Sequence, residues 1–317
     1  MSGAPPAGVP SVLAPAGTEA AALGELSVVL LVGAAVIFVL TMALLAWSLR
    51  RRPKAAVATG WWIVGGGIAL PVLVLSGLLL YGTVLTAALE RPPADPPLVV
   101  SVTGRMWWWE VRYRLPGSER EVVLANELRL PVGRSAHIAL ASADVIHSFW
   151  VPELGGKRDL TPGRLNHLVV TPSQAGTFRG QCAEFCGLQH AKMALHVVAL
   201  PPEDFERWLA QQAQPASAPE ADASPQASRG RLAFVEQGCA ACHTVRGAFE
   251  GARRGPDLTH VASRIGLGAG ALPNTPGAAR RWLHGVQEIK PGARMPSYAH
   301  LDAATLDALA AYLEQLR

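Results

Sequence analysis

The chain has 317 residues, enough for two or three folded units, and 50% of them are hydrophobic while only 16% are charged. This composition is apolar for a protein that lies wholly in water, so part of the chain is expected in a membrane. The net charge of +4 is small, and the Lys and Arg residues outside the apolar part are dispersed, which argues against a nucleic-acid partner.

Two long uncharged segments predict a pair of membrane-spanning helices. They run from Leu26 to Leu49 and from Ala55 to Leu89, and each exceeds the roughly 20 helical residues that cross a bilayer. The turn between them carries a basic cluster (Arg50, Arg51, Arg52 and Lys54), which the positive-inside rule places in the cytoplasm, so both chain ends lie on the periplasmic face. The alternative is a cleaved signal peptide, but its usual charged start is missing and the apolar run begins late.

The rest of the chain divides by composition. Short β-rich runs such as LVVSV, AHIALAS and NHLVV, separated by Gly, Pro and Asn, predict a small antiparallel sandwich or barrel, followed by a short helix at PPEDFERWLAQQ. The stretch QAQPASAPEADASPQAS is too polar to fold and predicts a flexible tether. We therefore expect an N-terminal periplasmic segment over 1–23, a helix hairpin over 24–90, a β-domain over 95–210, a linker over 211–228 and a helical domain over 229–317.

The motif CAACH at 239–243 is typical of covalent c-type haem attachment. Cys239 and Cys242 would bond to the haem vinyl groups, and His243 would ligate the iron. A thioredoxin-like dithiol would need a βαβ setting, and a zinc site would need more ligands nearby. Of the five Met residues only Met295 lies in this unit, so it is the expected second axial ligand. We expect His260, His284 and His300 to be surface residues.

The helical unit resembles class I cytochromes c beyond this motif. GPDL at 255–258 is similar to the family's loop in which a Pro carbonyl accepts the ring N–H of the haem His, which implies that role for Pro256. Gly230 and Phe234 on its first helix, with Tyr312 on its last, match the family's helix contact. These three residues are interpreted as packing.

The stretch QCAEFCGLQHAKM at 181–193 sets Cys182, Cys186, His190 and Met193 at short intervals. Gly187 and the β-like flanks favour a loop between strands over a helix. A disulfide would leave the His and the Met unexplained, and zinc has no use for the Met. Thiolate, imidazole and thioether together suit copper better.

This stretch resembles the copper-binding segment of subunit II of the haem–copper cytochrome c oxidases. The family motif is Cys-x-Glu-x-Cys-x-x-x-His-x-x-Met with another His upstream, here His147 in SADVIHSFWVP, and every position is present. The resemblance covers residues 20 to 210, and the added haem unit matches the subtype with a fused cytochrome c. It implies a cupredoxin fold and a dinuclear copper centre, CuA, with a ligand set of Cys182, Cys186, His147, His190, Met193 and the backbone carbonyl of Glu184.

The resemblance assigns two further roles. The side chain at Glu184 would bind a magnesium ion shared with subunit I. In GRMWWWE at 104–110, Trp107 matches the position where electrons arrive from cytochrome c, whereas core filling is the alternative for these rings. The family's mitochondrial-like members carry a Glu at the start of the second helix, near a proton path. The corresponding AAVATGWW has no carboxylate, so no proton-uptake role is expected.

The implied function is to pass electrons from the fused haem c domain through CuA to haem in subunit I, which reduces O2 to water and pumps protons. The implied location is a bacterial cell membrane, with subunit III and cytochrome c or another periplasmic donor as further partners. The alternatives are the copper subunit of a nitric oxide reductase and a membrane-anchored copper-binding or copper-delivery protein. Quinol oxidase relatives lack the copper ligands, so a quinol donor is disfavoured.

Overall fold

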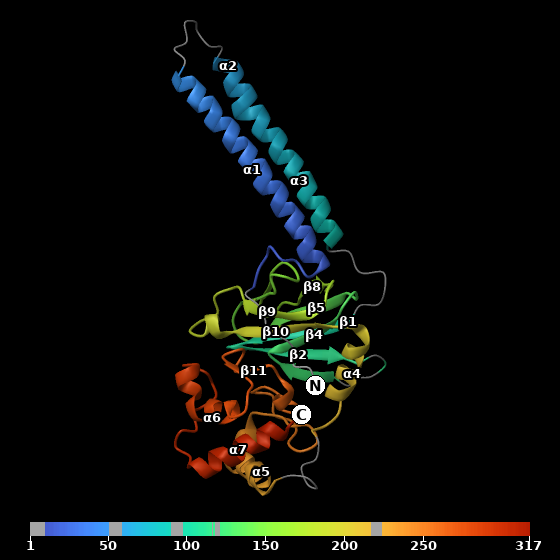
Figure 1. Ribbon diagram of the computed structural model, residues 1–317, viewed down its shortest axis with the longest axis vertical. Coiled ribbons are helices and arrows are strands. Elements are labelled where there is room, and N and C mark those ends of the chain that lie inside the picture. Colours follow the sequence, from blue (N-terminus) through green and yellow to red (C-terminus); the bar gives the residue numbers. More distant parts are fainter. Residues whose placement is uncertain (1–9, 51–58, 90–97, 116, 118–120, 217–223) are drawn as a thin grey trace.

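Three parts follow one another along the long axis of the molecule, as Figure 1 shows for the computed structural model of the chain. A helix hairpin lies at one end, a two-sheet β-domain in the middle and a small helical domain at the other end. The structure describes residues 10–50, 59–89, 98–115, 117, 121–216 and 224–317.

The hairpin consists of two long apolar helices. The first, α1, spans Thr18–Arg50, and the second is continuous over Thr59–Leu89, with a short α2 (Thr59–Trp61), a π-helical stretch η1 (Trp62–Ala69) and α3 (Leu70–Leu89). Both are long and apolar enough to cross a membrane. Arg50 ends α1. The other residues of the basic cluster, Arg51, Arg52 and Lys54, lie outside the described residues, as does the turn that we predict to be cytoplasmic.

Residues 16–19 are hydrogen-bonded to the β-domain. Ala16 N donates to the Glu153 carbonyl over 2.7 Å, and Thr18 N donates to the Thr171 carbonyl over 3.0 Å. The Glu19 carboxylate accepts from both the backbone N–H and the hydroxyl of Thr171, each over 2.8 Å. The start of the first membrane helix is therefore anchored to the folded β-domain.

The β-domain is a sandwich of two five-stranded sheets. One has the order β3-β2-β1-β5-β8, with bounds Glu121–Ala125, Trp108–Arg114, Leu98–Arg105, Ala136–Ser142 and Asn166–Val170. The other has the order β4-β10-β9-β6-β7, with bounds Glu127–Pro131, Ala194–Leu200, Gly176–Cys182, His147–Trp150 and Arg158–Leu160. Side chains on alternate positions, such as Val100 and Val102 of β1, fill the core between the sheets.

The expectation of an all-antiparallel sandwich is wrong for two strand pairs. β1 pairs in parallel with β5, and β10 pairs in parallel with β4. The strands between β1 and β5 belong to both sheets, so the chain returns to the first sheet in its original direction. The short helix α4 (Pro202–Gln212) follows β10, and its Phe205 and Trp208 rings contact Tyr113 in the core.

The C-terminal domain is built mainly from three helices, α5 (Pro225–Glu236), α6 (Ala278–Ile289) and α7 (Ala303–Gln315). Short elements lie between them: η3 (Cys239–Ala241), η4 (Val261–Ser263), β11 (Gly266–Leu267) and β12 (Leu272–Pro273). α5 crosses α7 at Gly230, where a Cβ would lie 1.9 Å from the Ala308 carbonyl oxygen. Phe234 contacts Tyr312 with ring centroids 5.5 Å apart, so the expected helix contact is present.

Both ends of the predicted linker are ordered. α4 extends to Gln212, and α5 begins at Pro225 with Ser224 as its N-cap. Between them, Ala216 N donates to the Arg246 carbonyl over 3.0 Å, so the chain leaving α4 already contacts the helical domain. Residues 217–223 of the predicted linker lie outside the described residues.

Candidate functional site

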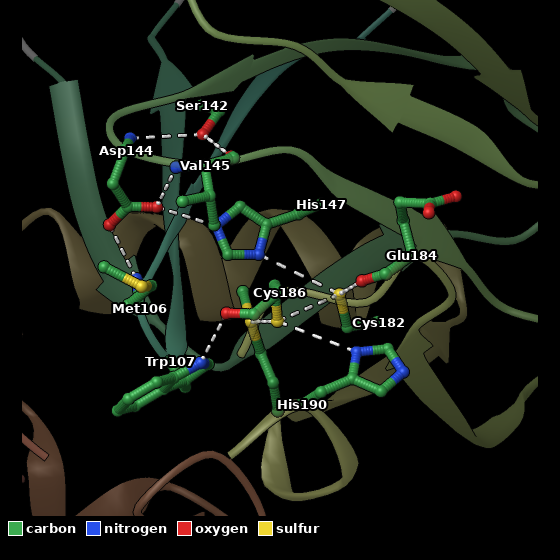
Figure 2. A network of polar contacts seen from close by, with 11 residues as sticks. Met106, Trp107, Ser142, Asp144, Val145, His147, Cys182, Glu184, Cys186 and His190 are labelled. Atoms are coloured by element: carbon green, nitrogen blue, oxygen red, sulfur yellow. Dashed lines mark hydrogen bonds and ion pairs between the residues drawn. The ribbon is translucent and has the colours of Figure 1, made fainter. Parts of the chain in front are cut away.

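The predicted copper segment is a loop between two strands of one sheet, as the sequence indicated. Cys182 ends β9 and Ala194 begins β10, and a single turn of 3-10 helix, η2 (His190–Lys192), lies between them. Gly187 has φ 106, a left-handed conformation that favours glycine and prevents a continuous helix here. Figure 2 shows how this loop brings both Cys and His190 beside His147 of β6.

The candidate ligand atoms converge around two sulfur atoms. The Sγ atoms of Cys182 and Cys186 lie 3.7 Å apart, well beyond the roughly 2.05 Å of a disulfide bond, and both are free thiols. Cys182 Sγ lies 3.9 Å from His147 Nδ1, and Cys186 Sγ lies 3.6 Å from His190 Nδ1. Met193 Sδ is 3.8 Å from Cys186 Sγ, and the Glu184 carbonyl oxygen is 3.2 Å from Cys182 Sγ.

The hydrogen bond between the two sulfur atoms shifts their pKa values in opposite directions. Hydrogen bonding from Cys186 lowers the pKa of Cys182 to about 3, against the opposing effect of burial. The same hydrogen bond, together with burial, raises the pKa of Cys186. Both cysteines would lose their remaining protons when they bind a metal.

His147 is held in place by a residue that the sequence reasoning missed. The ring is fully buried, and its Nε2–H donates to Asp144 Oδ1 over 2.8 Å, which leaves Nδ1 facing Cys182. Asp144 Oδ2 accepts from Met106 N over 2.8 Å. Burial opposes ionisation, yet these hydrogen bonds lower the pKa of Asp144, so it is a carboxylate. The signal in the sequence was an acidic residue three positions before a candidate His ligand.

Gly104 makes room for the same ring. A Cβ at this position of β1 would lie 2.7 Å from Cδ2 of His147. Such a distance is shorter than carbon atoms tolerate, so glycine is needed for the observed ring position. The sequence stretch GRMWWWE thus contributes to the site through its glycine as well as through its rings.

The donor set fits copper. Among the described residues, His147, Cys182 and Cys186 form a group whose ligand atoms all lie within 4.8 Å of one another. Soft sulfur ligands together with imidazole suit copper. Cys182 lies next to the imidazole of His147, and Cys186 lies next to that of His190. A single tetrahedral ion would leave the Met193 thioether without a role, whereas two ions can use every donor.

The three consecutive Trp residues occupy different environments. Trp109 is fully buried in the sandwich core, and Trp108 is half-buried with the Arg105 guanidinium 5.7 Å from its ring centroid. Trp107 is also half-buried, and its Nε1–H donates to the Cys186 carbonyl over 2.8 Å. The core-filling interpretation therefore holds for Trp109, whereas Trp107 contacts the candidate copper loop directly (Figure 2).

The predicted haem-binding residues lie at the start of the C-terminal domain. Cys239 opens η3, Cys242 follows it, and both are free thiols. His243 Nδ1 lies 2.7 Å from the Pro256 carbonyl oxygen, so this ring N–H donates as expected and Nε2 is left for iron. Burial lowers the pKa of His243, which favours the neutral imidazole that binds metals. A Cβ on Gly255 would lie 2.6 Å from that ring, so the loop approaches it closely.

The remaining candidates for axial ligation are placed as follows. Met295 lies in the loop after α6 and packs against the core of the domain, and its role as second axial ligand stays a prediction. His284 and His300 are exposed, as expected. The expectation that His260 is a surface residue is wrong, because it is 3% exposed and its Nε2 bonds to the Gln214 carbonyl.

Known proteins match both extramembrane domains. The family description "Cytochrome C oxidase subunit II, periplasmic domain" matches residues 115–200, and "Cytochrome c" matches residues 227–317. Cytochrome c oxidase subunit 2 of Alkalihalophilus pseudofirmus is 33% identical over 248 residues, covering 78% of this chain and 70% of the relative. The Bacillus subtilis protein of the same name is 31% identical over 264 residues, covering 79% and 72%. The crystal structure of the periplasmic domain of subunit II of cytochrome oxidase from Bradyrhizobium japonicum is 32% identical, with a TM-score of 0.34, and covers 38% of this chain and 95% of that chain.

Fold and sites together define a membrane electron-transfer protein with a cupredoxin-like domain for copper and a cytochrome c domain for haem. The chain belongs to the cytochrome c oxidase subunit II family, in a form that carries a fused cytochrome c domain. It is therefore subunit II of a cytochrome c oxidase and pairs with that enzyme's subunit I.

Proposed function

We propose that this chain receives electrons at its C-terminal haem c domain and passes them through a dinuclear CuA centre to haem in subunit I. There O2 would be reduced to water with proton pumping. The observation that carries this proposal is the pair of buried thiols, each within 4 Å of its own imidazole nitrogen, in one loop of the β-domain. Cys182 and Cys186 would hold the copper ions, which would supply a one-electron carrier.

The residues of the site suit electron transfer better than bond chemistry. His147, Cys182, Cys186 and Met193 are all buried, so water and substrate have little access to the ions that they would hold. Every donor that we assign to copper, including His190 and the Glu184 carbonyl, comes from this chain. A closed ligand set of this kind leaves no position for a substrate.

Trp107 connects the copper loop with the haem domain. Its indole N–H bonds to Cys186, and its ring lies 3.7 Å from the place where a Cβ on Gly292 of the haem domain would stand. We therefore assign Trp107 to the electron path, with the fused haem domain as the immediate donor. Cys239 and Cys242 would hold that haem covalently, with His243 and Met295 as its axial ligands.

The orientation follows from the hairpin. With the basic turn in the cytoplasm, both extramembrane domains would lie in the periplasm, where a soluble cytochrome c or another carrier can deliver electrons. The Glu184 side chain is exposed, which leaves it free to bind magnesium at the contact with subunit I. Subunit III would complete the complex.

Substrate consumption by the purified complex tests this function. We expect reduced cytochrome c to drive rapid O2 uptake and proton release, and the isolated chain to show neither. Faster consumption of nitric oxide than of O2 would favour a nitric oxide reductase instead. Purification of the chain without subunit I, holding one exchangeable copper, would favour a copper-delivery protein.

A further inference from the structure

Lys290 is a buried cation at the boundary between the two extramembrane domains. It caps the C-terminal end of α6 and is only 3% exposed, which is rare for Lys. Its Nζ donates to the backbone carbonyls of Trp107, Lys192 and Gly268, over 2.6, 2.8 and 3.0 Å. All three ammonium protons are therefore used. Two of these acceptors belong to the β-domain and one to the haem domain.

The two acceptors in the β-domain lie beside the candidate copper ligands. Lys192 stands between His190 and Met193 in the ligand loop, and Trp107 bonds to the Cys186 carbonyl. On the other side, Lys290 begins the segment that leads to Met295. One side chain thus joins the copper loop to the haem domain.

The haem-domain hairpin of β11 and β12 makes further contacts around this lysine. Ala194 N donates to the Ala269 carbonyl over 3.1 Å, and Ile265 N donates to Glu127 Oε2 over 2.9 Å. Gly268, Ala269 and Gly270 all have positive φ, which forms a tight turn directed at β10. A Cβ on Gly270 would lie 3.3 Å from that of Ala194, so the turn fits closely.

The set of acceptors around Lys290 Nζ is complete only when the two extramembrane domains are in contact. Burial takes the Lys290 amine out of water, so its protons need acceptors within the protein. With the domains apart, the carbonyls of Trp107 and Lys192 would be lost to it and water would replace them. Two of the three acceptors are therefore within reach of Lys290 only in the docked arrangement.

We propose that Lys290 is a positioning residue that fixes the haem domain on the copper-binding loop, so that the two cofactors sit at a set separation. The covalent tether then keeps the domains close, while Lys290 and the β11–β12 turn select one arrangement. This inference rests on the proposed electron path from haem c to CuA.

The test replaces Lys290 by Met in the complete oxidase, which keeps the chain length and removes the charge. Hydrogen exchange at Ile265 N and Ala194 N, which bridge the domains, should become at least about tenfold faster, because a charged donor to three carbonyls is lost. After photoreduction of the haem, electron transfer to copper should slow by a similar factor. The haem and copper spectra should not change.

Two further variants serve as a control and as a milder test of the same domain contact. Lys157→Met removes an exposed lysine of the β-domain and should leave exchange and rate unchanged. Lys192→Met removes only an exposed side chain that donates to the Ile289 carbonyl over 2.7 Å. It should give a smaller change in the same direction, even if Lys290→Met fails to fold.

The possible results distinguish a failure of the docking role of Lys290 from a failure of the proposed electron path. Unchanged amide protection in Lys290→Met would overturn the docking role, and lost protection with an unchanged transfer rate would overturn the positioning role. Absence of a copper spectrum in the unmodified oxidase would instead contradict the electron path, while the exchange measurement would still report on docking.

Discussion

Asp144 and Gly104 determine the position of the His147 ring, one by a hydrogen bond and the other by leaving space. The family resemblance singled out the side chains that the structure brings together, whereas their role as copper ligands stays a prediction. The role of Gly104 could not be assigned, because it depends on how β1 of one sheet packs across from β6 of the other. The only sign of Asp144 was its position three residues before His147. Lys290 is a similar case, since in the sequence it is an ordinary cation at the end of a helix.

Replacing Asp144 by Asn should weaken the copper site without unfolding the domain. Asn has one acceptor oxygen, whereas Asp144 accepts from Met106 N on one oxygen and from Val145 N and His147 on the other. We expect copper affinity to fall by about 10-fold to 100-fold. Competition with a copper chelator, followed by absorption, measures this change.

The matched control is Asp159→Asn, an exposed carboxylate on β7. It should bind copper as the unmodified chain does. Equal affinity in Asp144→Asn and Asp159→Asn would show that the carboxylate does not position His147.

At the scale of elements, the β-rich runs predicted the β-domain and several of its strands, such as β1, β5 and β8, but not how the strands pair. The parallel pairs β1–β5 and β10–β4 arise from chain crossings between sheets, which a local pattern cannot reveal. In the helical domain the small residue at the α5–α7 crossing was identified correctly. There the family resemblance supplied what periodicity alone does not, namely the partner helix.

Gly230→Ala should destabilise the cytochrome c domain strongly. The added Cβ would lie 1.9 Å from the Ala308 carbonyl oxygen and 2.8 Å from Cβ of Tyr312, so α5 and α7 must separate. Overpacking of this kind costs about 1–3 kcal/mol or more. Thermal unfolding followed by the haem absorption should show a clearly lower midpoint.

Ala227→Gly, at a buried position of the same helix, is the comparison for a change in helix propensity without added volume. It should cost roughly 1 kcal/mol. A smaller loss in Gly230→Ala than in Ala227→Gly would show that the helices tolerate the extra methyl group.

For the whole molecule, the order of hairpin, β-domain and haem domain could be read from composition, but their fixed connections could not. The sequence predicted a periplasmic N-terminal segment and a flexible tether, but not how the domains contact one another. In the structure, Glu19 is hydrogen-bonded to Thr171 at the membrane side, and Lys290 is hydrogen-bonded across the two extramembrane domains at the far side. Contacts between domains depend on surfaces that form only after folding, so no local sequence pattern predicts them.

We propose that the loop of Cys182, Cys186, His190 and Met193 holds two copper ions together with His147. Metal analysis of the purified oxidase, combined with its paramagnetic resonance spectrum, tests this proposal. We expect two copper ions in this subunit that share one unpaired electron, alongside one covalent haem. A single zinc ion in the loop, or a disulfide between Cys182 and Cys186 in the active complex, would contradict it.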